Sequence, residues 1–265
     1  MDFNKIYCID NVAGMQKYLA DGSVDLTVTS PPYDNQRTYE NALDWDFESV
    51  AKELYRVTKN GGVVVWIVND AVINKSESGT SFRQALYFKE IGFNLHDTMI
   101  WQKSGCTHPD STRYHQSFEF MFVFSKGKIA TVNLIADKPN SHRGRVSGRH
   151  RLKDGSLALK KHLNKLEIRP VGVRYNIWKI STGFRNVTKD PIAYEHPAIF
   201  PEALARDHIL SWSNEGDLVL DPFMGSGTVA IAAIDTNRKY IGFDCIQKYC
   251  NVAEQRIKNL NRKIV

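Results

Sequence analysis

Two short stretches near opposite ends of the chain hold residue types that could do chemistry. The first, TSPPY at residues 29–33, follows VDLTV, whose β-branched residues predict a strand. Consecutive prolines fix their own backbone and cannot donate sheet hydrogen bonds. The stretch therefore predicts a rigid kink at a strand end, with the hydroxyl of Ser30 and the ring of Tyr33 flanking Pro31 and Pro32. Taken alone, a simple strand-ending turn explains it as well.

The second stretch, DPFMGSGT at residues 221–228, predicts a strand that ends at Asp221 and a glycine loop that opens a helix. Gly225 and Gly227 begin a G-x-G-x-x-A pattern that Ala230 completes. Glycines let the backbone approach a ligand closely, and a helix N-terminus offers free N–H groups to an anion. No lysine follows the glycines, which argues against the usual phosphate loop of nucleoside triphosphate enzymes.

Two acids narrow the ligand that this loop could bind. Asp244 lies 19 residues after Gly225, the spacing expected of an acid that grips ribose hydroxyls. Asp221 would repel a pyrophosphate but suits an ammonium group. S-adenosylmethionine has an amino-acid head, a ribose, and an adenine that could contact Phe223 and Phe243. The glycine pattern by itself also fits a nicotinamide or flavin site, or a tight turn without a ligand.

Strand-like and helix-like segments alternate on both sides of an irregular, charged middle segment. This alternation predicts an α/β fold with one mostly parallel, doubly wound, Rossmann-like sheet. We expect the segment at 128–180 to be an insertion that does not build the sheet. The expected strands lie at 6–10, 24–28, 63–68, 95–103, 118–128, 217–221 and 239–244, and the expected helices at 47–59, 81–93, 196–213, 227–237 and 246–260.

TSPPY and DPFMGSGT together resemble the paired signature of the amino-group DNA methyltransferases, which methylate exocyclic nitrogens of cytosine or adenine. Their order resembles the β arrangement of that family, in which the catalytic tetrapeptide (here Ser-Pro-Pro-Tyr at residues 30–33) comes first and the cofactor glycines last. The resemblance runs from about Lys5 to Ile257 and is weakest in 128–180. It implies a catalytic half at 1–127, a target-recognition insertion at 128–180, and a cofactor-binding half of the same domain at 181–265.

The resemblance also implies roles for individual residues. Ser30 and the carbonyl of Pro31 would accept hydrogen bonds from the target amine, and Tyr33 would stack on a base flipped out of the duplex. Asp10 resembles the acid near the cofactor adenine, although a helix cap explains it nearly as well. The implied catalytic residues are Ser30, Pro31, Pro32 and Tyr33, and the implied cofactor residues are Asp10, His196, Pro197, Asp221, Phe223, Gly225, Ser226, Gly227, Thr228 and Asp244.

Ser30 bears on which base is methylated. In this family a serine before Pro-Pro-Tyr is commoner in enzymes that act on cytosine N4, and aspartate or asparagine is commoner in enzymes that act on adenine N6. The resemblance therefore favours a DNA cytosine-N4 methyltransferase that uses S-adenosyl-L-methionine. An adenine-N6 enzyme is the alternative, and an RNA methyltransferase is a more distant one.

The middle of the chain is strongly basic. Thirteen basic residues lie between Lys138 and Arg185, opposed only by Asp154 and Glu167, whereas the whole chain carries +6. Such an insert is typical of a module that binds a polyanion, so we expect it to contact double-stranded DNA; an ordinary solvated loop is the alternative. The expected DNA contacts are Arg143, Arg145, Arg149, Arg151, Lys160 and Lys161.

The composition indicates the class of protein and the compartment in which it is expected. The 265 residues are 42% hydrophobic and 24% charged, as in an ordinary globular protein. No apolar run approaches the roughly 20 residues of a membrane helix, and the N-terminus lacks a signal-peptide pattern. The cysteines Cys8, Cys106, Cys245 and Cys250 show no C-x-x-C spacing, so we expect reduced thiols and no zinc site. We expect a cytoplasmic protein encoded by a bacterium, an archaeon or a phage.

Other functions stay open at this point. A nicotinamide oxidoreductase shares the glycine loop but explains neither TSPPY nor the basic insert. A methyltransferase of RNA or protein could use the same stacking ring, and a DNA-binding protein without turnover could keep the fold. Family members occur with a cognate restriction endonuclease and alone, and the sequence leaves both arrangements, and a homodimer, open.

Overall fold

The computed structural model describes residues 2–32, 34, 45–105, 111–141, 149–159 and 168–264. Contacts divide the chain into two compact units. The larger unit comprises residues 1–133 and 176–265, and the smaller unit comprises residues 134–175. Tyr33, the last residue of TSPPY, lies outside the described residues.

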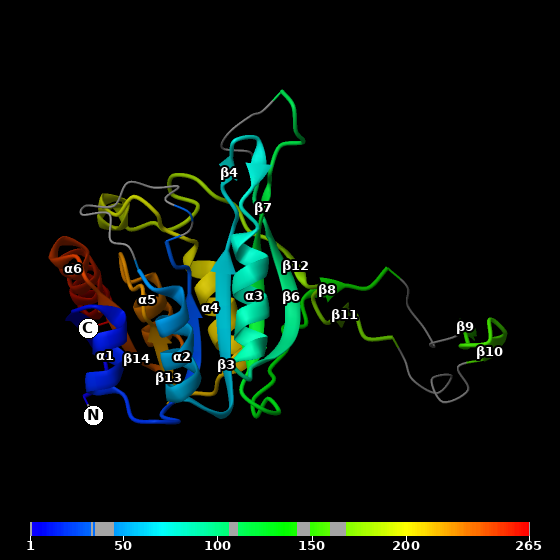
Figure 1. The fold of residues 1–265 in the computed structure, drawn as a ribbon, viewed down its shortest axis with the longest axis horizontal. Coiled ribbons are helices and arrows are strands. Elements are labelled where there is room, and N and C mark those ends of the chain that lie inside the picture. Colours follow the sequence, from blue (N-terminus) through cyan, green and yellow to red (C-terminus); the bar gives the residue numbers. More distant parts are fainter. Residues whose placement is uncertain are drawn as a thin grey trace. The chain divides into compact units, whose positions relative to one another are not determined.

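The larger unit is built on an eight-stranded sheet in the order β1-β14-β13-β2-β3-β7-β6-β12 (Figure 1). Only β7 runs antiparallel to its neighbours, so the predicted α/β fold with a mostly parallel, doubly wound sheet is confirmed. The strands are β1 (Lys5–Cys8), β2 (Val24–Thr29), β3 (Thr58–Val68), β6 (Asn94–Gln102), β7 (Phe118–Ser125), β12 (Ile177–Lys179), β13 (Leu218–Asp221) and β14 (Lys239–Asp244), and a short hairpin joins β4 (Val72–Ile73) to β5 (Ser76–Glu77).

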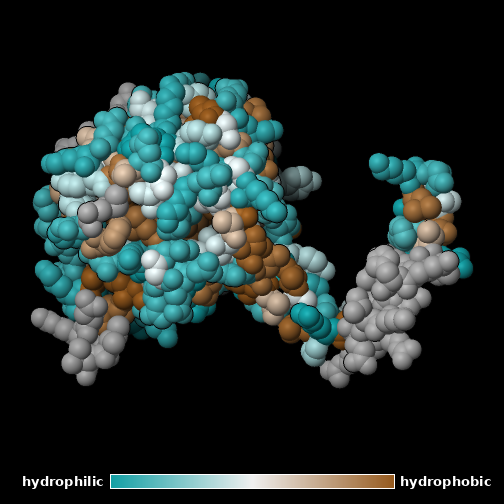
Figure 2. Space-filling view, turned by 90° about the horizontal axis from the view of Figure 1, so that it is seen from below, coloured by the Kyte–Doolittle hydropathy of each residue, from teal (hydrophilic) through white to brown (hydrophobic). Residues whose placement is uncertain are grey.

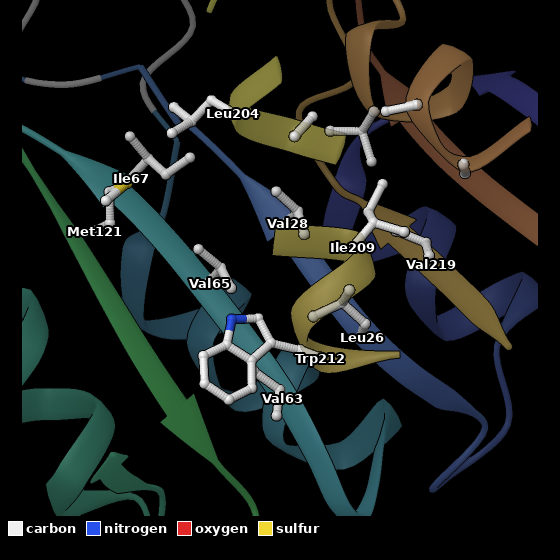
Figure 3. Close-up of a cluster of buried hydrophobic side chains, with 14 of the residues drawn as sticks. Leu26, Val28, Val63, Val65, Ile67, Met121, Leu204, Ile209, Trp212 and Val219 are labelled. Carbon is white, nitrogen blue, oxygen red and sulfur yellow. The ribbon is translucent and has the colours of Figure 1, made fainter. Parts of the chain in front are cut away.

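Helices cover both faces of this sheet because its central strands are apolar on both sides. Along β3, Val63, Val65 and Ile67 pack toward α4 and its neighbours (Figure 3), whereas Val64 and Trp66 pack in the cluster of α1, α2 and α3. The helices are α1 (Asn11–Tyr18), α2 (Phe47–Val57), α3 (Thr80–Glu90), α4 (Glu202–Trp212), α5 (Thr228–Asp235) and α6 (Gln247–Ile264), with the short 3-10 helix η2 (Pro191–Glu195) before α4.

On the face drawn in Figure 2, hydrophilic residues cover much of the larger unit, and hydrophobic residues gather in a few patches. Among the described residues, no helix combines the length and the apolar character that crossing a bilayer requires.

The two sequence motifs follow neighbouring strands. β13 pairs with β2 in parallel, with Val219 opposite Leu26 and Leu220 opposite Thr27. Because parallel strands end at the same edge of a sheet, the residues after β2 and after β13 emerge side by side. The fold therefore brings together two segments that lie nearly 200 residues apart along the chain.

The expectation that 128–180 contributes no strand to the sheet is wrong at one place. β12 pairs in parallel with β6, with Trp178 opposite Trp101, and forms the edge of the sheet. Trp178 is buried and stacks on His208 of α4, with ring centroids 4.5 Å apart. Burial of Trp178 against Trp101 and His208 holds β12 at the sheet edge. These partners are distant in sequence, so no local pattern predicts the strand.

The smaller unit consists of two short antiparallel pairs, β8 (Lys138–Pro139) with β11 (Val171–Gly172) and β9 (Arg149–Arg151) with β10 (Leu157–Leu159). None of the buried hydrophobic residues that the structure describes belongs to it. Strand pairing and polar contacts therefore hold the described parts of this unit, instead of an apolar core.

Candidate active site

One hydrogen bond joins the two motifs directly. The hydroxyl of Thr29, the last residue of β2, donates to Oδ1 of Asp221, the last residue of β13, at 2.7 Å. Both residues are buried, and the backbone N–H of Phe223 donates to the same oxygen at 3.0 Å. Ser30, which follows Thr29, therefore lies one residue from a direct contact with the glycine motif.

The electrostatics of Asp221 are unusual. Burial raises the pKa of its carboxyl to about 7, although the hydrogen bonds from Thr29 and Phe223 oppose the shift. No ion pair to it occurs within the part of the chain that the structure describes. A buried carboxylate without a cation is costly, so this position favours a cationic ligand group.

The loop after β13 requires its glycines. Gly225 and Gly227 have positive φ angles of 50° and 81°, where other residues are strained. A Cβ atom on Gly225 would lie 3.0 Å from Nε2 of His196, and one on Gly227 would lie 2.8 Å from Cβ of Ala253. The loop thus packs tightly against His196 and α6 before it enters α5, and the close approach of its backbone to a ligand stays a prediction.

Asp244, at the end of β14, closes the other side of the loop. Its Oδ2 accepts from the N–H of Gly225 at 2.8 Å, and its Oδ1 accepts from the N–H of Ile246 at 2.9 Å. Burial raises the pKa of this carboxyl. Each carboxylate oxygen can accept two hydrogen bonds, so Asp244 keeps acceptor capacity for a ligand hydroxyl.

Asp10 lies at the next strand end. Its Oδ1 caps α1 by accepting from the N–H of Ala13 at 2.9 Å, which confirms the capping interpretation. The neighbouring Ile9 N–H donates to the Asp244 carbonyl at 2.9 Å, so Asp10 flanks the same edge of the sheet. The proposed contact of Asp10 with adenine stays a prediction.

An aromatic side chain links the tetrapeptide to the glycine motif. Trp45 Nε1 donates to the carbonyl of Pro32 at 3.2 Å, and the Trp45 ring meets the Phe223 ring edge to face at 4.9 Å. The bond holds the backbone next to Pro31, which is buried. No local pattern predicts this role, because Pro32 lies 13 residues before Trp45 and Phe223 follows a different strand, β13.

His196 and Pro197 precede α4. His196 Nδ1 accepts from the N–H of Ala198 at 3.2 Å, and its ring meets Tyr249 of α6 edge to face at 4.3 Å. Burial lowers the pKa of His196 to about 4, so the ring is neutral near pH 7. His196 therefore supports the glycine loop as a neutral side chain, whereas Pro197 is exposed.

Arg256 of α6 is a site residue that sequence reasoning missed. Its fully buried guanidinium donates to the carbonyl of Ser226 at 2.6 Å and forms ion pairs with Asp190 at 3.2 Å and Glu202 at 2.5 Å. A signal existed: Arg256 interrupts the buried face of α6 at helical spacing. The other buried residues described on α6 are Tyr249, Cys250, Val252 and Ala253.

The predicted DNA contacts are only partly described. Arg149 and Arg151 are exposed on β9 of the smaller unit. Arg143, Arg145, Lys160 and Lys161 lie outside the described residues. Their roles stay predictions.

Known proteins resemble most of the chain. A family model for N6/N4 methyltransferases, described as DNA methylase, matches residues 24–255. The orphan methyltransferase M.BamHII of Bacillus amyloliquefaciens is 56% identical over 248 residues, with 92% of each chain covered. The DNA adenine methyltransferase YhdJ of Escherichia coli K12 is 28% identical, with 94% of this chain and 80% of YhdJ covered. The solved PvuII DNA methyltransferase (cytosine-N4-specific) matches with a TM-score of 0.70 and 22% identity, covering 94% of this chain and 84% of that one.

Proposed function

Because this chain belongs to the N6/N4 family of DNA methylases, it is a DNA methyltransferase, and we propose that it methylates the exocyclic N4 amine of cytosine in double-stranded DNA. S-adenosylmethionine is the proposed methyl donor. The single observation that best supports the proposal is the hydrogen bond between Thr29 and Asp221, because it joins the proposed amine-binding and cofactor-binding motifs at one edge of the sheet.

The residues around the glycine loop suit S-adenosylmethionine. The buried Asp221 carboxyl, whose pKa is raised to about 7, suits the ammonium of the amino-acid head, and the N-terminus of α5 suits its carboxylate. Asp244 can accept from the ribose hydroxyls. When bound, this cofactor supplies an electrophilic methyl group on a positively charged sulfur. The chain would hold it through Asp221, Asp244 and the backbone of the loop that begins at Gly225.

The tetrapeptide acts on the nucleophile. The exocyclic amine of a base is a poor nucleophile because its lone pair is delocalised into the ring. Ser30 Oγ and the Pro31 carbonyl would accept hydrogen bonds from the amine, which favours a pyramidal nitrogen with a more available lone pair. The prolines fix the carbonyl direction, and Trp45 holds the next carbonyl at 3.2 Å, so these acceptors are in place before the base arrives. The nitrogen then releases one proton to water after transfer.

A base inside the duplex cannot reach this edge of the sheet, so the target must be extruded. Tyr33 is proposed to stack on it. The basic segment from Lys138 to Arg185 would neutralise backbone phosphates, and binding should weaken steeply with salt, with a slope of about −0.9 per phosphate contact.

Ser30 supports cytosine N4 over adenine N6 as the acceptor, following the family tendency at the first position of the tetrapeptide. Adenine N6 is the alternative because the same acceptors can hold either amine, and because the similar protein YhdJ is named as an adenine methyltransferase.

The test is to identify the methylated nucleoside. The purified protein is incubated with S-adenosylmethionine and either duplex DNA or RNA of the same sequence, and the digested products are separated by mass spectrometry. N4-methylcytosine from the duplex alone is the expected result. N6-methyladenine alone would replace the proposed base by the alternative, and 5-methylcytosine or methylated RNA would contradict the proposal.

A further inference from the structure

Phe184, Arg185 and Tyr194 form an exposed group in the segment between β12 and α4, which we call the aromatic platform. The Phe184 side chain is 65% exposed, and its ring contacts Tyr194 at a centroid distance of 4.8 Å. The Arg185 guanidinium lies 5.6 Å from the centre of the same ring. A large apolar ring held in water beside a cation has a free face that could stack on a planar partner.

The three residues of the platform line a surface pocket of about 420 Å3 together with Lys189 and Pro191. Two of these residues are cations, and none of the lining residues is a carboxylate. Aromatic rings interleaved with cations are the usual means of binding a nucleotide, in which the base stacks and the phosphate meets positive charge.

Hydrogen bonds hold the platform in shape. The N–H of Arg185 donates to the hydroxyl of Tyr194 at 2.7 Å, and that hydroxyl donates to the carbonyl of Thr188 at 3.1 Å. Asn186 donates to the carbonyl of Thr182 at 3.1 Å across the same turn. The ring of Phe184 is therefore presented by a backbone that is already ordered, which lowers the entropy cost of binding.

The same segment is tied to the glycine loop. Arg256 bonds both Asp190, one residue from Lys189, and the carbonyl of Ser226. His196 follows η2 and lies against Gly225. The platform thus belongs to the edge of the sheet where the proposed transfer takes place.

We propose that Phe184 stacks on a base of the substrate DNA that loses its neighbour when the target base leaves the duplex, while Arg185 and Lys189 bind the adjoining phosphates. This rests on the proposed function. Extruding one base exposes the faces of the bases beside it and opposite it, and a rigid ring that covers one of these faces lowers the cost of opening.

The experiment compares Phe184→Ala, Phe184→Leu and Phe184→Trp with the wild-type protein. Three quantities are measured: affinity for duplex DNA in the presence of S-adenosylmethionine, the single-turnover methylation rate, and the fluorescence of 2-aminopurine placed at the target position, which rises when that base leaves the stack. Alanine and leucine should weaken DNA affinity by about tenfold, as loss of one stacked base does, and should lower the 2-aminopurine signal. The Phe184→Trp variant should retain the DNA affinity and the 2-aminopurine signal, because tryptophan also presents a flat ring.

Phe3→Ala is the matched control. Phe3 is a half-exposed ring that also lies under a cation, Lys239, but it precedes the amino end of β1. The Phe3→Ala substitution should leave DNA affinity, the methylation rate and the 2-aminopurine fluorescence unchanged. Cofactor affinity should stay within twofold in every variant, which separates stacking from a disturbed loop.

The proposal is overturned if Phe184→Ala binds and methylates duplex DNA like the wild type, or if leucine restores function as well as tryptophan does. A wild-type protein that methylates no DNA would instead refute the proposed function, so the two failures are distinguishable. Arg185→Gln and Lys189→Gln should each reduce the salt slope of DNA binding by about one.

Discussion

At the scale of single residues, the candidate site contains a carboxyl group, that of Asp221, whose pKa is raised by burial. Asp221 is buried, its Oδ1 is already used by Thr29 and Phe223, and its pKa is raised to about 7. Such a group exchanges its proton near neutral pH, and a cationic ligand should favour its ionised form. If Asp221 binds the ammonium of the cofactor as proposed, cofactor binding and the protonation of Asp221 are linked.

The dissociation constant of S-adenosylmethionine should reflect this linkage. With a pKa of about 7, Asp221 is about one-tenth ionised at pH 6 and about nine-tenths ionised at pH 8. Binding measured by calorimetry should therefore be about tenfold weaker at pH 6 than at pH 8. The Asp221→Asn variant should bind more weakly at both values and lose this difference. The titration of the ligand itself is common to both proteins, so equal pH dependence in the two would contradict the assignment.

At the scale of elements, α6 holds the glycine loop in position through the side chain of Arg256. Arg256 joins α6 to the carbonyl of Ser226, to Asp190 before η2, and to Glu202 in the first turn of α4. One side chain thus sets the positions of three segments that meet at the site. Removing one member of a buried ion pair leaves its partners without compensation, which is more costly than losing an exposed pair.

Arg256→Met should lower the free energy of unfolding by about 2–4 kcal/mol, because Asp190 and Glu202 keep their charges at a partly buried position. Cofactor affinity should also fall, since the carbonyl of Ser226 loses its donor. Urea unfolding and calorimetry measure the two effects. Arg206→Met is the control: Arg206 is more than half exposed on α4, and its loss should change stability by less than about 0.5 kcal/mol. Arg256→Met behaving like this control would show that Arg256 does not position the loop.

At the scale of the whole molecule, the site exists because β2 and β13 are neighbours in a parallel sheet. Strongly patterned segments could be predicted from sequence: the β-branched run before Ser30 is a strand, and the glycines after Asp221 open a helix. Both patterns are local and repeat with the period of the element that they build.

What the sequence did not predict depends on distant contacts. α1 was not expected because Gly14 weakens its helix pattern, yet a Cβ there would lie 2.5 Å from the ring of Phe243, so packing requires the glycine. β12 follows from the burial of Trp178. The role of Trp45 follows from its contacts with the carbonyl of Pro32 and with the ring of Phe223, which comes after β13. In each case the partner is set by the tertiary fold and not by neighbouring residues.

The tetrapeptide and the glycine loop are proposed to form one catalytic site, in which the first binds the target amine and the second binds the cofactor. The most direct test of this proposal is the single-turnover rate of methyl transfer to duplex DNA by Ser30→Ala, with the dissociation constant of S-adenosylmethionine measured on the same preparation. The rate should fall by about 10²–10³-fold, as loss of one preorganised hydrogen-bond partner does, and cofactor affinity should stay within twofold. A Ser30→Ala protein that methylates DNA at the wild-type rate would contradict the proposal.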